Sequence, residues 1–133
     1  MRLSARYAAG MVRSVLVPAL VVAGVWWLAW AALVLGWRRW IGLTAAPPHP
    51  EHPRLVLAGP FRRARHPQTL GGLCLAAAAA IAWWSPSVAV GSGLASTALL
   101  MRARRDDAVQ AKRFGAAYAR YRRAVPFLFP RWR

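Results

Sequence analysis

The sequence predicts an all-α membrane protein with about three transmembrane helices and a cytosolic C-terminal amphipathic helix. Three observations predict this fold. Hydrophobic residues make up 58% of the 133 residues, a high share for a soluble domain. The apolar residues are gathered in long runs, and most of the positive charge, +16 in total, lies between and after them. The chain also has eight tryptophans, several of them close to arginines, as in an interfacial belt.

The first apolar run covers residues 14–36 and is predicted to be a transmembrane helix. It contains no charged residue, and about 20 apolar residues suffice to cross a hydrocarbon core of roughly 30 Å. Arg2, Arg6 and Arg13 precede it. A cleaved signal peptide is the alternative, but the apolar region of a signal peptide has only about 7–15 residues. We therefore favour a membrane anchor.

Residues 37–58 are predicted to form a linker, because four prolines in seven residues at its centre exclude a helix. The same segment contains His49 and His52, which invite comparison with a metal site that also includes His66 and Cys74. Their spacing matches no standard ligand set, so no metal is expected.

A helical hairpin is predicted next. Two apolar runs, residues 69–84 and 88–101, are separated by a break at Pro86. Counting 20 residues from this proline in each direction reaches His66 and Asp106. Each arm then measures about 30 Å, which matches the hydrocarbon core. The count therefore predicts that these two polar residues return to the same end of the hairpin.

The last predicted helix covers residues 102–123. Phe114, Tyr118 and Tyr121 follow the i, i+4, i+7 spacing of one helix face in an arginine-rich segment. This pattern is typical of a helix that lies at a membrane surface or folds back over the hairpin. The aromatic stripe has two interpretations, packing of the helix against the bundle or direct contact with a substrate.

The charges also predict an orientation. Three cations precede the first predicted span, and the other 16 of the 19 follow it. The positive-inside rule then predicts a multi-pass protein with its N-terminus outside and its C-terminus in the cytosol. We expect it in a bacterial inner membrane.

Asp106 and Asp107 are two of only three acids in the chain, and they stand where the second arm ends. They either pair with neighbouring arginines and hold the last helix, or they join His66 at the start of the helix predicted from Pro67. Free amides at that helix end suit a carboxylate, and the acids suit hydroxyl or ammonium groups.

Two groups of residues flank the predicted hairpin. The first comprises Gly59-Pro60-Phe61-Arg62, Arg65-His66-Pro67 and Gly71. The second comprises Asp106-Asp107, Phe114-Gly115, Tyr118, Tyr121, Val125-Pro126 and Pro130. Together they resemble, over roughly residues 55–130, the motifs of the isoprenylcysteine carboxyl methyltransferase and phospholipid methyltransferase superfamily of integral membrane enzymes.

The resemblance implies transfer of a methyl group from S-adenosylmethionine to a membrane lipid or small-molecule acceptor at the cytosolic face. The implied cofactor-binding residues are Arg65, His66, Thr69, Gly71, Asp106 and Asp107. The implied substrate-contacting residues are Tyr118 and Tyr121. No catalytic residue is assigned, no metal or nucleic-acid partner is expected, and the oligomeric state is left open.

Some positions depart from the family's pattern. Thr69 stands where tyrosine is usual, Asp106 and Asp107 replace glutamates, and Phe127 replaces a common arginine. A diverged, non-catalytic membrane protein of the same fold is therefore the alternative. A basic module that binds a membrane surface or nucleic acid is a weaker one, because the chain has no nucleic-acid-binding motif.

Overall fold

The computed structural model describes residues 2–36, 55 and 57–130, and every regular element in this part of the chain is helical. The elements are α1 (Arg2–Leu35), a short 3-10 helix η1 (Gly59–Arg62), α3 (Pro67–Trp83) and α4 (Pro86–Ala124). The predicted all-α class is confirmed. Most of the predicted linker, with His49 and His52, lies outside the described residues.

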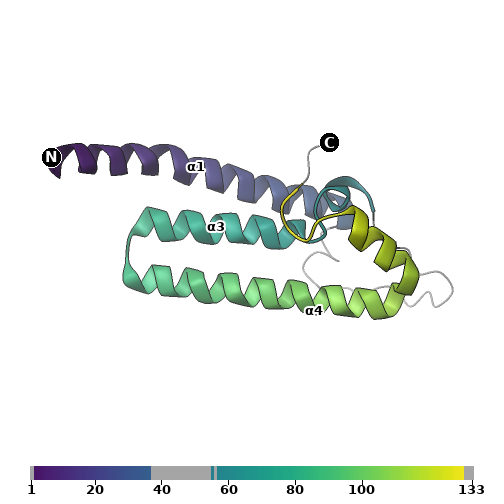
Figure 1. Cartoon of the computed structure of the whole chain (residues 1–133). Coiled ribbons are helices and arrows are strands. Elements are labelled where there is room, and N and C mark those ends of the chain that lie inside the picture. Colours follow the sequence, from purple (N-terminus) through teal and green to yellow (C-terminus); the bar gives the residue numbers. More distant parts are fainter. Residues whose placement is uncertain (1, 37–54, 56, 131–133) are drawn as a thin grey trace.

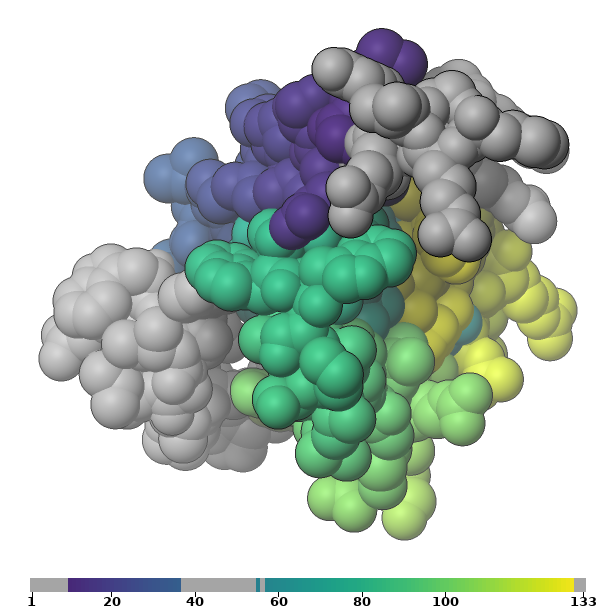
Figure 2. Space-filling view, turned by 90° about the vertical axis from the view of Figure 1, so that its left-hand side faces the viewer, coloured from purple at the N-terminus to yellow at the C-terminus, as the bar shows by residue number. Residues whose placement is uncertain are grey.

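The three long helices lie side by side, with α3 packed against both α1 and α4 (Figure 1). The N-terminus and the turn between α3 and α4 lie at one end of this bundle, whereas η1 and the end of α4 lie at the other. Figure 2 looks onto the first end, where the turn (teal to green) lies between α1 (purple) and α4 (green). Trp83 and Trp84 are exposed at this turn.

The backbones of α1 and α3 touch where two glycines face each other. A Cβ atom on Gly24 would lie 2.9 Å from the carbonyl oxygen of Gly71, and one on Gly71 would lie 2.9 Å from the carbonyl oxygen of Gly24. No side chain fits between atoms so close, so glycine allows this contact. On its other side, α3 packs Gly72 against Leu99 of α4. Small residues thus bring all three helices together.

α4 is longer than the predicted hairpin arm. It begins at Pro86 and extends, with one kink, through the segment predicted to be a separate amphipathic helix. Its only non-helical residue is Gly115, with φ 51° and ψ −123°. The chain bends sharply there, and residues 116–124 turn back toward the ends of α1 and α3 (Figure 1).

Among the described residues, one helix is long and apolar enough to cross a membrane by length and composition. This segment of α1 is Gly10–Leu35, and it lies near the N-terminus. The helix itself begins at Arg2, well before the predicted start of the span. α3 is also apolar, but its 17 residues make it shorter than this segment of α1. The presence of three membrane spans therefore stays a prediction. Exposed apolar side chains suited to lipid lie along α1: Val12, Val15, Val22, Trp26 and Leu33.

Candidate functional site

A group of polar side chains, which we call the polar cluster, forms where three segments meet. Arg65 and His66 come from the turn before α3, Asp107 from the middle of α4, and Tyr118 from α4 beyond its bend. Pro67 begins α3 as predicted, with His66 at the N-cap position. Residues more than 40 positions apart in the sequence are thereby brought together.

Asp107 is the centre of the polar cluster. Nη1 of Arg65 donates to both carboxylate oxygens, at 2.5 Å from Oδ1 and 2.6 Å from Oδ2. Nε2 of His66 lies 3.3 Å from Oδ1, and the hydroxyl of Tyr118 donates to the same oxygen. The carboxylate therefore has three side-chain partners in the protein itself. An arrangement so well connected fixes the position of every member.

The chain after α4 covers the polar cluster. The backbone amides of Arg65 and His66 donate to the carbonyl oxygens of Pro126, at 3.0 Å, and Phe127, at 3.2 Å. The ring of Phe127 has its centre 4.8 Å from that of His66 and 5.3 Å from the guanidinium carbon of Arg65. Nearby, the hydroxyl of Tyr121 donates to the carbonyl oxygen of Phe61 at 2.7 Å. These contacts shield the cluster from solvent.

Burial and hydrogen bonding set the protonation states. Burial acts to raise the pKa of Asp107, but the hydrogen bonds from Tyr118 and Arg65 outweigh it, and the net pKa is lowered. Burial, together with the hydrogen bond to Asp107, raises the pKa of Tyr118 to about 12. At neutral pH the cluster thus contains an ionised Asp107 and a protonated Tyr118.

His66 titrates differently, because burial lowers its pKa from 6.5 despite the hydrogen bond to Asp107. The folded protein then binds fewer protons than the unfolded chain, so stability falls as pH decreases below about 6.5. The lowered pKa of Asp107 adds a second loss below about 3.9.

We expect the melting temperature in detergent to be nearly constant from pH 8 to pH 7 and to fall in these two steps on acidification. In the variant His66→Gln the upper step should disappear. An upper step of the same size in this variant would assign it to other groups.

The two neighbouring acids have different surroundings. Oδ1 of Asp107 lies 3.3 Å from Nε2 of His66. The side chain of Asp106 is 57% exposed, and its Oδ2 lies 3.9 Å from Nε of Arg102, one turn earlier on α4. Both acids return to the depth of His66 as predicted, but the direct contact with His66 is made by Asp107, because consecutive residues of a helix point about 100° apart.

The other predicted site residues have packing positions. Gly71 lies in the contact with α1, and Thr69 is buried in the first turn of α3 with 8% exposure. Tyr121 bonds to the chain near η1. None of the three has a hydrogen bond to the polar cluster among the contacts of the described residues. Their roles toward a cofactor or substrate stay predictions.

Two buried polar atoms near this end of the protein have no hydrogen-bond partner among the described residues. They are Nε of Arg65, a donor, and Oε1 of Gln110, an acceptor. Sequence analysis missed Gln110, although it follows Asp107 by three residues and so shares its face of α4. Among all the residues that the structure describes, no group of three His, Cys, Asp or Glu residues is placed to hold a metal ion.

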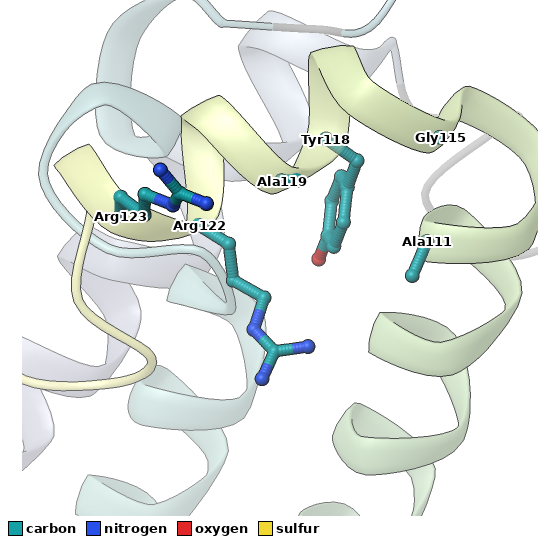
Figure 3. A pocket seen from close by; sticks show the side chains of 6 residues that line it. All are labelled: Ala111, Gly115, Tyr118, Ala119, Arg122 and Arg123. Atoms are coloured by element: carbon teal, nitrogen blue, oxygen red, sulfur yellow. The ribbon is translucent and has the colours of Figure 1, made fainter.

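A pocket of about 490 Å³ lies inside the bend of α4, and we call it the elbow pocket. Figure 3 shows the side chains of Tyr118 and Arg122 pointing into the space between the two parts of the helix. The lining residues are Ala111, Gly115, Tyr118, Ala119, Arg122 and Arg123. Tyr118 belongs to both the elbow pocket and the polar cluster, so the two are adjacent.

The fold and the polar cluster define a helical protein with one candidate membrane span among its described residues and a polar site at one end of its helical bundle. A family model described as phospholipid methyltransferase matches residues 12–117, and the chain belongs to this family. The match includes α1 from Val12 onward, α3, and α4 as far as Ala117. Arg65, His66 and Asp107 lie within it, and Tyr118 follows its last residue. Neither a curated protein nor a solved structure matches the chain. Family membership supports a methyltransferase that works in or at a membrane.

Proposed function

We propose that the protein transfers a methyl group from S-adenosylmethionine to a lipid or small acceptor at the cytosolic face of the membrane. One observation carries this proposal. Arg65 and His66, in the first motif, contact Asp107, in the second, at 2.5 to 3.3 Å. Two motifs on opposite sides of the hairpin thus form one site, in a chain of the phospholipid methyltransferase family.

The proposed topology has three spans, formed by α1, α3 and the first half of α4, with the N-terminus outside. The exposed Trp83 and Trp84 at the hairpin turn suit one membrane interface. Arginines at the opposite end, around η1 and after Met101, suit the cytosolic interface. The polar cluster then faces the cytosol, in the inner membrane of a bacterium.

The residues present fit the cofactor. S-adenosylmethionine has a carboxylate, an ammonium group and ribose hydroxyls, and its sulfonium supplies an activated methyl group. Nε of Arg65 is a buried donor suited to the carboxylate, and Oε1 of Gln110 is a buried acceptor suited to the ammonium or a hydroxyl. Both atoms lack a partner among the described residues, so a ligand can satisfy them.

The protein's own residues can hold the reactants in position and limit the access of water to the site. Phe127 and its neighbours cover the polar cluster, which limits water at the site. Neutral His66 directs Nε2–H at the ionised Asp107, so Nδ1 is the ring nitrogen left as an acceptor. Methyl transfer depends chiefly on holding two reactants in line, and a rigid cluster suits that task.

Binding of S-adenosylhomocysteine to the detergent-purified protein tests the proposal. We expect His66→Ala and Asp107→Asn each to weaken this binding at least about tenfold, the cost of roughly one charge-assisted hydrogen bond. Asp106→Asn is the matched control, because its carboxylate is exposed on another face, and it should leave the affinity unchanged. Absence of binding to the unmodified protein at millimolar ligand would exclude the enzyme hypothesis.

A non-catalytic membrane protein of the same fold is the second candidate. Its support is that Asp107 already accepts hydrogen bonds from three side chains of the protein, as a purely structural clamp does. In that case Asp107→Asn destabilises the fold, and neither the unmodified protein nor any variant binds S-adenosylhomocysteine. Titration of the unmodified protein separates the two candidates, because loss of the Asp107 carboxylate is expected to destabilise the fold in either case.

A further inference from the structure

The chain beyond the bend of α4 folds across the end of the bundle that carries the polar cluster (Figure 1). We call residues 116–130 the C-terminal cover. Tyr118 and Val125 are its buried hydrophobic residues, whereas the alanines and arginines of its helical part are exposed and Phe129 is 78% exposed. A segment that buries so little apolar surface opens at a lower free energy than packed helices do.

Hydrogen bonds attach the C-terminal cover to the rest of the protein. The hydroxyl of Tyr118 donates to Asp107, and that of Tyr121 donates to the carbonyl oxygen of Phe61. The backbone carbonyls of the cover accept two further bonds, of 3.0 and 3.2 Å, from the turn before α3. Water can take the place of such partners, so breaking each bond has a small net cost. The attachment is therefore specific in geometry but reversible.

Gly115 is placed to act as the hinge of the C-terminal cover. Its φ of 51° and ψ of −123° interrupt the helix between the arm that packs on α3 and the cover. A Cβ at this position would have no atom within 4 Å, and the elbow pocket, of about 490 Å³, lies inside the bend (Figure 3). Hinges are formed by a few residues that absorb a large change in φ and ψ. The space around Gly115 permits such a change, which would straighten α4.

The polar cluster needs such a movement for a ligand to reach it. Nε of Arg65 is a buried donor without a partner among the described residues. The ring of Phe127, in the C-terminal cover, has its centre 5.3 Å from the guanidinium carbon of Arg65. On the other side, α1 and α3 are held together by the close backbone contact between Gly24 and Gly71. The C-terminal cover is therefore the part that gives access at the least cost.

We propose that the C-terminal cover is a lid, hinged at Gly115 and latched by the hydroxyl of Tyr118 on Asp107, which opens to admit a ligand to the polar cluster. Closing restores the contacts of Phe127 with the cluster and excludes water from the bound ligand. The lid operates whatever the ligand is, so it stands independently of the proposed methyl transfer.

Two spin labels placed across the hinge test the lid in full-length protein in detergent micelles. Cys74→Ser removes the only cysteine, and the labels are attached through Arg104→Cys before the bend and Arg120→Cys after it, both exposed positions. Double electron–electron resonance should detect a shorter distance for the closed lid and a longer one for the open lid. The control pair, Val90→Cys with Arg104→Cys, lies before the bend and should give a single distance, about 21 Å along the helix axis.

Tyr118→Phe removes the latch and should raise the ratio of open to closed lid roughly tenfold or more, the effect of losing one hydrogen bond to a charged group. Ala117→Ser is the matched control, a change at the exposed neighbouring residue, and should leave this ratio unchanged. One unchanged distance for the hinge pair, with and without the Tyr118 hydroxyl, would overturn the proposal. A second distance in the control pair would do so too, because it signals unfolding of α4.

Hydrogen exchange of the unmodified protein is an independent test that does not depend on a variant. The amides of Arg65 and His66 donate to the C-terminal cover, so they should exchange at least about tenfold faster than amides in the middle of α3. Equal rates would mean that the cover opens only by global unfolding, which contradicts a lid. Saturating S-adenosylhomocysteine should slow the exchange of both amides. If this ligand does not bind, the proposed function fails, whereas the label distances without ligand still decide the lid.

Discussion

Replacing Asp107 by alanine is expected to destabilise the folded protein by about 3–5 kcal/mol, the usual cost of leaving one partner of a buried ion pair alone. The side chain of Arg65 is only 10% exposed, and that of Asp107 only 14%. Without the carboxylate, the guanidinium keeps its charge in a covered site, and the hydroxyl of Tyr118 loses its acceptor. Unfolding titrations in mixed detergent micelles measure the difference.

Two controls distinguish the effect of leaving a buried charge unpaired from the effect of removing an acidic side chain. Asp106→Ala removes an exposed carboxylate paired with Arg102 and should change stability by no more than about 1 kcal/mol. The double variant Arg65→Met, Asp107→Leu removes both buried charges and should cost less than Asp107→Ala alone. A destabilisation by Asp107→Ala as small as that by Asp106→Ala would mean that the cluster is open to water.

Sequence patterns predicted the hairpin and the end of the bundle that carries the site. Pro67 and Pro86 begin α3 and α4 because a proline has no amide hydrogen to lose in the first helical turn. Counting residues along both arms of the hairpin correctly predicted that His66 lies at the same end of the bundle as Asp106 and Asp107. Such a count gives only the position along the helix axis. Whether Asp106 or Asp107 turns inward depends on how α4 is rotated against α3.

Contacts that depend on a distant segment were not predictable. Phe127 was noted only as a missing arginine, yet its ring lies against His66 and Arg65. The motif predicts a cofactor role for Gly71, which stays a prediction, and gave no sign of its backbone contact with Gly24 of α1. In both cases the partner comes from a segment whose position no local pattern specifies.

A last helix folded back over the hairpin was one of two alternatives, but the position of the bend was not predicted, because the aromatic residues on both sides of Gly115 keep helical spacing. A backbone with φ 51° and ψ −123° is accessible to glycine and strained for any residue with a Cβ. The space around Gly115 is open, since a Cβ there would have no atom within 4 Å. Conformation, and not crowding, therefore requires glycine at this position.

We accordingly expect Gly115→Ala to destabilise the bent form by about 1–3 kcal/mol. A straighter α4 carries Tyr118 away from Asp107 and withdraws the carbonyl groups of Pro126 and Phe127 from the turn before α3. The amides of Arg65 and His66 should then exchange with deuterium faster, which peptide-resolved mass spectrometry detects.

Gly91→Ala is the matched control for the bend. Gly91 lies in the same helix, is exposed and has no atom within 4 Å of a Cβ, but its φ is not positive. Alanine in a regular helix is favoured over glycine by up to about 1 kcal/mol, so this variant should be as stable as the unmodified protein or more so. The same substitution thus has opposite signs at the two glycines. Slow exchange at Arg65 and His66 in Gly115→Ala would show that the contacts around Asp107 hold the C-terminal segment in place without the glycine.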